Sequence, residues 1–382
     1  MTDQTRREGG AALAVGRLTL SDFRCYSFLR MDAGPQPVVL TGPNGAGKTN
    51  ILEALSFLAP GRGLRRARLG EVVRREAGAE APWGVAARIE RGDETREVGT
   101  GREAGSERRV VRIDGQPARS QSALAEVLSV LWLTPAMDRL FTEGASGRRR
   151  FLDRLVLGFD AGHGARAAAY DHALRERARL LKEGRAEPAW LHVLEETMAR
   201  QGVAMAAARK ETVTRLNEAC RQGIGPFPAA ELAVAGSVED SLATLSAQQA
   251  EARLQGLLAA SRRHDAESGG AAEGPHRSDL KVRHAVKNLP AEQCSTGEQK
   301  AVLVAIVLGQ ARIQAALRGW APILLLDEVT AHLDQTRRAA LFDELCALPA
   351  QSWLTGTDQS LFAELGQRGQ FFRVHDAIVT RA

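Results

Sequence analysis

The spacing of apolar and polar residues divides the chain into a strand-rich beginning, a helical middle and a mixed end. From Val15 the segment VGRLTLSDFRCYSFLRMD alternates apolar and polar positions, as strands of an antiparallel sheet do, and the apolar strand PVVL follows it. Further strands and hairpins are expected over residues 84–115. Residues 1–14 are polar and rich in Gly and Ala, and we predict a disordered lead-in there.

The pattern changes near Ser146. From there to Gln222 apolar residues recur every three or four positions among Ala, Arg and Glu, which predicts helices packed against one another. The break GIGPFP interrupts this region, and a second helical run is expected over residues 246–263. From Ser295 a long helical run, the apolar strand ILLLDE, another helix and the strand SWLTGT alternate, which is typical of a sheet covered by helices.

Together these patterns predict an α/β protein. Its core is an ABC-type ATPase head, a mixed sheet with flanking helices, and a mainly helical lobe is inserted into that head. We expect the first part of the head over residues 15–145, the lobe over 146–272 and the second part of the head over 273–382.

Composition adds little but excludes several classes of protein. The four cysteines lie far apart without the spacing of metal ligands, so neither a disulfide framework nor a zinc site is expected. No run of about 18 apolar residues and no secretory signal occurs, so we expect a cytoplasmic protein with no membrane partner. The formal net charge of +5 favours a polyanionic partner, although on its own it is weak evidence.

A phosphate-binding loop is the most specific motif. The sequence GPNGAGKT satisfies the P-loop pattern GxxxxGK[ST], follows the strand PVVL and leads into an apolar-periodic helix. Its backbone amides would surround the phosphates of ATP, Lys48 would reach the β- and γ-phosphates, and Thr49 would bind Mg²⁺. The alternative is a glycine-rich turn that fits by chance. The predicted nucleotide-binding residues are Gly42, Pro43, Asn44, Gly45, Ala46, Gly47, Lys48 and Thr49.

Two carboxylates end the strand ILLLDE, which has the form of a Walker B strand. Asp327 would hold the Mg²⁺ shell, and Glu328 would orient or deprotonate the attacking water. These two residues and Lys48 are the predicted catalytic residues. An apolar strand that ends in a solvated acidic turn is the alternative, and the neighbouring motifs are what favour the catalytic interpretation.

The segment CSTGEQK resembles the LSGGQ-type signature of ABC ATPases, with Ser295 and Gly297 as its phosphate-binding positions. An ordinary helix N-cap is the alternative, because Ser295 and Glu298 also have the spacing of a capping box. In ABC proteins the signature faces the nucleotide of a second head. The order P-loop, signature, Walker B therefore predicts that ATP bridges a homodimer.

Two further elements follow the Walker B strand. The segment VTAHLD resembles the D-loop, with Asp334 as its acidic residue, and a plain turn before a helix is the alternative. The segment TGT, residues 355–357, lies where ABC enzymes have a switch histidine. Because no histidine is present there, Thr355 or Thr357 is a candidate sensor of the γ-phosphate.

The distance between the motifs distinguishes among ATPase classes. Most of the chain separates Thr49 from Asp327, whereas the ATPase subunit of an ABC transporter, the competing interpretation, normally has these motifs in a shorter domain. The helical insertion is the layout of the SMC-like branch. The insertion is too short for the long coiled-coil arm of an SMC protein, and no metal-binding nuclease cluster occurs. Within this branch, an SMC-like or nuclease-linked head is therefore disfavoured.

Several stretches resemble the RecF family in the family's order. These are LTLSDFRCY at residues 18–26, GPNGAGKTNILE at 42–53, FTEGASGRRRFLD at 141–153, GPHRSD at 274–279 and the Walker B and D-loop region at 322–334. Two positions depart from the family pattern. Glu328 stands where the family often has a second aspartate. Ser278 replaces an acidic residue, which puts any catalytic role of the GPHRSD loop in doubt.

The resemblance implies a cytoplasmic ATPase of DNA replication, recombinational repair and the SOS response. Such a protein dimerises with ATP, binds single-stranded and gapped or junction DNA, and works with RecO and RecR to help load RecA. The basic clusters are candidates for phosphate contacts with DNA, and solvated faces or internal ion pairs are the alternative. They comprise Arg148, Arg149 and Arg150 in one cluster and Arg62, Arg65, Arg66 and Arg68 in the other.

Overall fold

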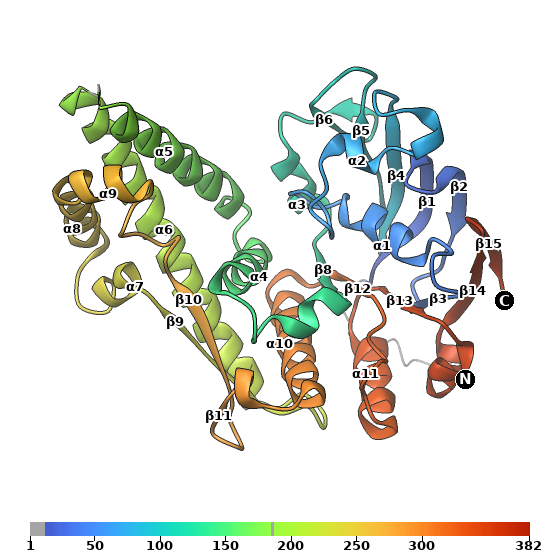
Figure 1. The fold of residues 1–382 in the computed structure, drawn as a ribbon. Helices are drawn as coiled ribbons and strands as arrows, with labels where there is room; N and C mark the ends of the chain where they lie inside the picture. Colours follow the sequence, from blue (N-terminus) through green and yellow to red (C-terminus); the bar gives the residue numbers. More distant parts are fainter. Residues whose placement is uncertain (1–11, 185–186) are drawn as a thin grey trace. The chain divides into compact units, whose positions relative to one another are not determined.

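The computed structural model describes residues 12–184 and 187–382, which form two compact units (Figure 1). The first unit consists of residues up to 138, 223–228 and 295–382, and the second of 139–222 and 229–294. These boundaries differ from those predicted. Residues 273–294 belong to the second unit, because a strand at residues 279–284 pairs with a strand at 230–235, which lies within the predicted lobe.

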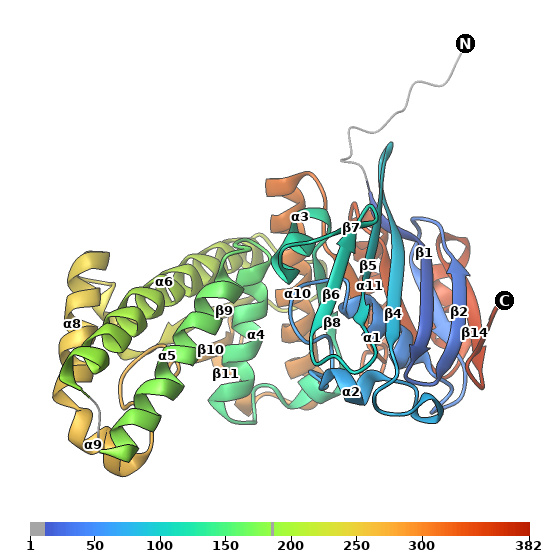
Figure 2. The ribbon, with the colours of Figure 1, turned by 90° about the horizontal axis from the view of Figure 1, so that it is seen from above.

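An antiparallel sheet opens the first unit, as the alternating pattern predicted. Its order is β2-β1-β4-β5-β6-β7, and Figure 2 shows its larger strands side by side. The predicted lead-in is wrong at its end, because Leu13 and Ala14 are buried within β1; residues 1–11 lie outside the described part of the chain. The strands are β1 (Leu13–Phe23), β2 (Tyr26–Asp32), β4 (Trp83–Arg91), β5 (Glu94–Arg102), β6 (Arg109–Ile113) and β7 (Gln116–Pro117).

A second sheet in the same unit has the order β15-β14-β3-β13-β12-β8. Its strands run parallel except β15, which is antiparallel to β14. Strands β3, β12 and β13 are buried along their whole length, as expected for parallel strands covered on both faces. The strands are β3 (Val38–Thr41), β8 (Val130–Leu133), β12 (Ile323–Leu326), β13 (Ser352–Gly356), β14 (Gln370–His375) and β15 (Ile378–Arg381).

Helix α1 (Lys48–Ser56) joins the two sheets, because its buried side chains share one hydrophobic core with residues of both. Helices α2 (Leu69–Val72), α3 (Leu124–Val127), α10 (Thr296–Arg318) and α11 (Gln335–Ala347) complete this unit. Within the described residues α10 alone has the length and apolar composition of a membrane span. It is 72% buried inside the protein over its most apolar window, as the core helix of a globular unit is.

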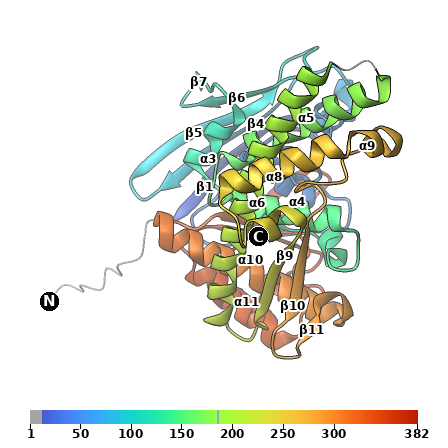
Figure 3. The same ribbon diagram turned by 90° about the vertical axis from the view of Figure 1, so that its left-hand side faces the viewer.

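The second unit is mainly helical but not entirely so. Its helices are α4 (Ala145–Leu157), α5 (His163–Glu183), α6 (Pro188–Arg221), α7 (Ser237–Ser241), α8 (Ala247–Ala260) and α9 (Arg262–Ser268). Helices α5 and α8 pack against the long helix α6 (Figure 3). The unit also contains a three-stranded sheet, which the sequence patterns did not predict: β9 (Ala230–Ala235), β10 (Asp279–His284) and β11 (Leu289–Pro290).

A buried ionic cluster lies between the helices of the second unit. The guanidinium group of Arg177 donates to Glu195 Oε1 at 3.0 Å, to Asp265 Oδ2 at 2.8 Å and to the carbonyl oxygen of Leu258 at 2.5 Å. All three charged side chains are almost inaccessible to solvent. Buried charges are tolerated only when they are paired and hydrogen-bonded, so this cluster fixes α5, α6, α8 and α9 in one arrangement.

Candidate nucleotide-binding site

The P-loop lies between β3 and α1, and two of its glycines are required by close contacts. Gly42 has a φ of 150°, and a Cβ atom there would lie 2.0 Å from the carbonyl oxygen of Val374 in β14. Gly47 has a φ of 112°, and its Cβ would lie 2.6 Å from the hydroxyl of Tyr26. A side chain at either position would therefore displace its neighbours, and both φ values lie in the region that favours glycine. The loop is therefore enclosed by β14 on one side and by the start of β2 on the other.

Lys48 lies across its own loop. Its Nζ atom donates to the carbonyl oxygens of Gly42 at 2.7 Å and of Pro43 at 2.8 Å. Burial lowers the pKa of Lys48, while the nearby carboxylates of Glu328 and Asp327 act in the opposite direction. A triphosphate bound at the start of α1 would meet this ammonium group and the first amides of the helix, which have no partner inside the helix.

Thr49 and Thr355 converge on one oxygen of Asp327. The hydroxyl of Thr49 donates to Asp327 Oδ1 at 3.0 Å, and the hydroxyl of Thr355 donates to the same atom at 2.7 Å. The topology explains this meeting, because β13 lies between β3 and β12, so that the carboxyl ends of three parallel strands are adjacent. The predicted sensor Thr355 is fully buried, and it reaches Asp327 directly.

The backbone of Glu328 is held in an unusual conformation. Its φ is 50°, in the left-handed region that costs a non-glycine residue roughly 1–2 kcal/mol. Its amide donates to Thr355 Oγ1 at 2.9 Å, and its carbonyl oxygen accepts from Lys300 Nζ at 3.3 Å. Bonds on both sides of the residue thus hold a sharp turn at the end of β12. The turn leaves Asp327 buried and Glu328 half-buried, so the two carboxylates have different environments.

The residues at this point fit a magnesium ion bound to a nucleotide. Thr49 and Asp327 bring two oxygen atoms within 3.0 Å of each other at the N-terminus of α1. Oxygen ligands are the ones that Mg²⁺ prefers, and it usually takes one or two from the protein and the rest from phosphates and water. When bound, the ion would neutralise phosphate charge, while Lys48 would contact the phosphates from the loop.

The signature residues lie at the surface of the first unit. Ser295 is exposed and Gly297 is half-buried at the start of α10. Ser295 also caps this helix: its Oγ accepts from the amide of Glu298 at 3.4 Å, and its own amide donates to Glu298 Oε2 at 3.0 Å. The capping interpretation therefore holds, and it does not exclude the other one, because a surface hydroxyl at a helix N-terminus remains accessible to a phosphate from another molecule.

Asp334 also lies at the surface, at the N-terminus of α11. Its carboxylate accepts from the amide of Arg337 at 2.8 Å and so caps this helix. His332, two residues earlier, has a φ of 64°, and its carbonyl oxygen lies 3.6 Å from the position that a Cβ of Gly297 would take. The predicted D-loop and the signature are thus neighbours within one chain.

The arginines of the first predicted DNA cluster differ in their contacts. Arg148 forms two hydrogen bonds with the carboxylate of Asp279, at 2.7 and 3.0 Å, and this pairing raises the pKa of Arg148. Arg149 is half-buried and donates to the carbonyl oxygen of Ser278 at 2.8 Å. Arg150 is exposed. The internal ion pair, one of the two alternatives, thus describes Arg148, and Arg150 is the residue best placed for a phosphate.

The second basic cluster lies in the loop after α1. Arg65 donates to Asn50 Oδ1 and to Glu53 Oε2, both at 2.8 Å, so it is tied to α1. Glu53 is fully buried and also accepts two bonds from Arg24. Arg62, Arg66 and Arg68 are exposed. Arg65 therefore has a structural partner next to the P-loop, which its position in a run of arginines did not indicate.

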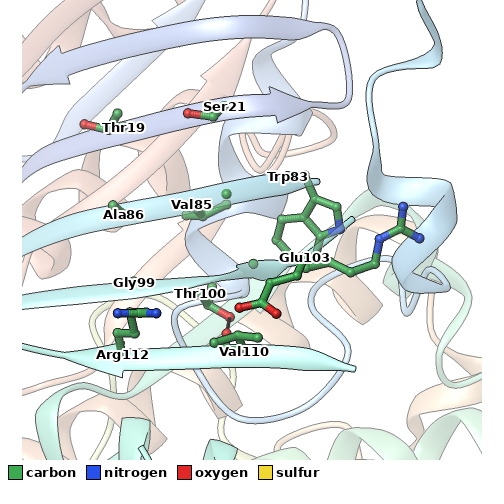
Figure 4. A pocket seen from close by; sticks show the side chains of 13 residues that line it. Thr19, Ser21, Trp83, Val85, Ala86, Gly99, Thr100, Glu103, Val110 and Arg112 are labelled. Carbon is green, nitrogen blue, oxygen red and sulfur yellow. Dashed lines mark hydrogen bonds between the residues drawn. The ribbon is translucent and has the colours of Figure 1, made fainter. Parts of the chain in front are cut away.

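A hollow of about 290 Å³ lies on the open face of the antiparallel sheet, and none of the predicted site residues lines it (Figure 4). Its floor is formed by small residues at alternate positions, among them Ser21, Gly84, Ala86, Gly99 and Gly101. Because successive strand residues point to opposite faces, this is the face away from α1, whose core partners are the intervening residues. The hollow therefore belongs to a different surface from the P-loop.

Sequence reasoning missed three residues of this site: Lys300, Asp138 and Tyr26. Lys300 ends the CSTGEQK segment, but its partners lie in the turn after β12 and in a short 3-10 helix at Pro135–Arg139. Tyr26 approaches the P-loop from β2 and donates to the carbonyl oxygen of Gly47 at 3.2 Å. No local pattern marks these contacts, since each joins segments that are distant in the chain.

Comparison with known proteins gives consistent results over almost the whole chain. The family described as the RecF/RecN/SMC N terminal domain matches residues 14–379. A protein of Agrobacterium fabrum called DNA replication and repair protein RecF is 50% identical over 373 residues, which cover 96% of this chain and 98% of that protein. The Rhizobium meliloti protein of the same name is 50% identical over 369 residues, covering 95% and 98%.

Solved structures with the same fold are similar over the same extent. A structure of the recombination mediator protein RecF–ATPrS in the RecFOR pathway superposes with a TM-score of 0.85 at 21% identity, covering 98% of this chain and 100% of that chain. The corresponding RecF–ATP structure has a TM-score of 0.81 at 21% identity, covering 97% and 100%. An Smc head bound to the C-winged helix domain of ScpA is more distant, with a TM-score of 0.55 at 15% identity and 97% coverage of both chains.

Proposed function

The chain belongs to the RecF family, within the RecF/RecN/SMC N terminal domain group, and on this premise we propose that it is an ATPase of DNA replication and repair in which ATP and Mg²⁺ join two copies over DNA. Each P-loop would hold a triphosphate through the residues from Gly42 to Thr49. The signature of the second copy, Ser295 and Gly297, would contact the γ-phosphate. Hydrolysis by Glu328 would then release the dimer from DNA.

This proposal depends on one observation: the residues at the P-loop and the residues of the signature lie at different places in one chain. Thr49, Asp327 and Thr355 meet at the P-loop, whereas Ser295 lies exposed at the start of α10. A surface serine at a helix N-terminus is suited to bind an anion that comes from outside the chain. A second copy of the same chain supplies such an anion through its bound ATP, and an isologous pair of copies closes both sites at once.

The competing interpretation, the ATPase subunit of a membrane transporter, is not supported. The full-length similarity is to proteins called DNA replication and repair protein RecF, and the inserted unit of residues 139–222 and 229–294 is part of the matched region. We propose a cytoplasmic protein that binds single-stranded and gapped or junction DNA, works with RecO and RecR, and so aids RecA. The exposed Arg150 and the half-buried Arg149 are the proposed phosphate contacts of the lobe.

Sedimentation velocity with and without ATP and Mg²⁺ tests the dimer. Glu328→Gln should bind ATP, fail to hydrolyse it and accumulate as a dimer, because the amide cannot accept a proton from the attacking water. Lys48→Met, which lacks the ammonium group for the phosphates, should stay monomeric at any ATP concentration. A Glu328→Gln protein that binds ATP and still remains monomeric would contradict the proposal.

The signature contact has a matched control within the chain. Ser295 and Ser246 both cap a helix through a capping box, with Glu298 and Gln249 respectively, and both are exposed. Replacement of either by Arg removes one cap, which costs about 1 kcal/mol. In the Glu328→Gln background only Ser295→Arg should prevent dimerisation. Gel shifts on gapped, single-stranded and duplex DNA, with and without ATP, then show whether the dimer is the DNA-binding form.

A further inference from the structure

A chain of hydrogen bonds, completed by an ion pair, leads from the end of β12 to Asp138. The hydroxyl of Thr355 donates to Asp327 and accepts from the amide of Glu328. The carbonyl oxygen of Glu328 accepts from Lys300, whose ammonium group also lies 3.7 Å from Asp138 Oδ2. All of these residues belong to the first unit. The proposed catalytic carboxylate is thus connected to a residue that has no place in any nucleotide motif.

Lys300 is the central member of this chain. It lies in α10 at the end of the CSTGEQK segment, and its side chain is almost fully buried. A buried ammonium group must find acceptors within the protein. Its two acceptors come from the turn after β12 and from the 3-10 helix Pro135–Arg139, so α10 is fixed at this point to both segments.

Asp138 occupies a particular position in the chain. It is the last residue of the first unit before the insertion, and Arg139 is the first residue of the second, inserted unit. The 3-10 helix that carries Asp138 spans this transition. A change in the course of the chain where it leaves the first unit would therefore move the carboxylate that Lys300 faces.

We propose that Lys300 is a positioning residue for ATP hydrolysis, which holds Glu328 through its backbone carbonyl, and that Asp138 couples this hold to the state of the inserted unit. Glu328 has a strained, left-handed backbone conformation, which must be held by hydrogen bonds to its amide and to its carbonyl oxygen. The Thr355 hydroxyl supports its amide side. Its carbonyl oxygen accepts from the amide of Ala331 at 3.1 Å within the turn, and from Lys300, the side chain that ties this turn to α10. Loss of Lys300 would let the turn relax and displace the carboxylate from the attacking water.

The inference rests on the proposed function, because it assumes that Glu328 acts on the water and that DNA binds the inserted unit. It adds a route by which DNA would change the rate of hydrolysis. In this route DNA alters the course of the chain at Asp138, Asp138 changes its hold on Lys300, and Lys300 changes the position of Glu328. The nucleotide contacts of the P-loop are not part of the route.

Substitution of Lys300 gives the first test. Lys300→Met should lower kcat on the order of 10- to 100-fold while ATP affinity and the ATP-dependent dimer are retained, because only the position of the carboxylate changes. Lys300→Arg, which can still donate to the carbonyl oxygen, should recover a large part of the rate. A purely structural role would affect affinity, dimerisation and rate together, and Arg would not restore the rate selectively.

Lys210 provides a matched control in the second unit. Its ammonium group likewise donates to a glutamate carbonyl oxygen, that of Glu239, at 3.1 Å. Lys210→Met should therefore leave kcat unchanged. An equal fall of kcat in Lys210→Met and Lys300→Met would overturn the inference, and so would a Lys300→Met protein that hydrolyses ATP at the normal rate.

Substitution of Asp138 tests the coupling and remains informative if Lys300→Met fails to fold. Asp138→Asn keeps the shape and removes the charge, so basal hydrolysis should continue while the change in rate on adding gapped DNA falls towards onefold. A DNA effect of normal size in Asp138→Asn overturns the coupling. These failures differ from failure of the proposed function, which would appear as a monomeric Glu328→Gln protein in saturating ATP.

Discussion

Thr49 Oγ1 donates a hydrogen bond of 3.0 Å to Asp327 Oδ1, although the two residues are 278 positions apart in the chain. Thr49 lies in the first turn of α1, and Asp327 directly follows β12. The contact brings together two predicted Mg²⁺ ligands from segments that the inserted unit separates. Side chains that support this contact should therefore affect hydrolysis.

Thr355 is the clearest of these supports. Thr355→Val keeps the shape of the side chain but removes the donor to Asp327 and the acceptor for the amide of Glu328, which leaves buried polar groups unpaired at a cost of about 1–3 kcal/mol. We expect a lower melting temperature and a larger fall in kcat than in ATP affinity. Thr355→Ser keeps the hydroxyl and should behave nearly as the parent protein in the same calorimetric and ATPase measurements.

Gly47 and Gly61 separate backbone strain from a steric clash. Their φ values are 112° and 107°, so Ala is strained at both positions by roughly 1–2 kcal/mol. A Cβ at Gly61 meets nothing within 4 Å, whereas at Gly47 it lies 2.6 Å from the Tyr26 hydroxyl and 2.9 Å from Cys25 Sγ. Gly47→Ala should therefore lose ATP binding in a fluorescent-nucleotide titration. Gly61→Ala should bind ATP almost normally, and similar losses in both would contradict the packing argument.

Arg148 and Arg150 should respond differently to replacement. Arg148→Ala leaves Asp279 without its bidentate partner and should lower the free energy of unfolding by about 1–3 kcal/mol. Arg150→Ala should leave stability unchanged, since the side chain is exposed, but should weaken DNA binding and reduce the slope of log K against log salt by about one. Denaturant titrations and salt-dependent gel shifts measure the two effects. An unchanged salt slope in Arg150→Ala would remove this residue from the DNA contacts.

From the contacts of Asp153 we expect the inserted unit to lose stability at acidic pH. Burial alone would raise its pKa, but hydrogen bonds from His163 and Arg209 outweigh burial and lower it below the ordinary value of 3.8. A carboxyl whose folded pKa is depressed adds stability above its unfolded pKa, and this stability is lost as the pH falls through the folded pKa. The free energy of unfolding should therefore fall as the pH drops below about 4.

Asp153→Asn tests this assignment. It removes the carboxylate that accepts two hydrogen bonds from the buried guanidinium of Arg209 and leaves only Glu239, 4.0 Å away, so stability at pH 7 should fall by roughly 3–5 kcal/mol, and the acid dependence should become flatter. Asp240→Asn serves as the control because Asp240 is exposed. Denaturant midpoints measured between pH 3 and pH 7 give both quantities, and an unaltered acid slope in Asp153→Asn would contradict the role of this carboxyl.

The local features of this protein could be predicted from its sequence. Alternation predicted the antiparallel strands, the apolar runs predicted β3 and β12, and the P-loop and signature were recognised from contiguous residues. These features depend on neighbours in the chain, where the periods of strands and helices and the preferences of capping residues act directly. The order of the motifs then indicated a head divided by an insertion.

Which distant residues meet depends on the tertiary structure. Because β10 pairs with β9, residues 273–294 belong to the second unit, and the same strand places Asp279 beside Arg148, so that this predicted DNA contact has an ionic partner within its own unit. The contacts of Lys300 with Glu328 and Asp138 likewise join segments that are distant in the chain. Such contacts depend on packing between segments that are distant in the chain, which the local periodicity of the sequence does not reveal. From the sequence alone, a charged residue that faces water therefore cannot be distinguished from one that faces DNA or a buried partner.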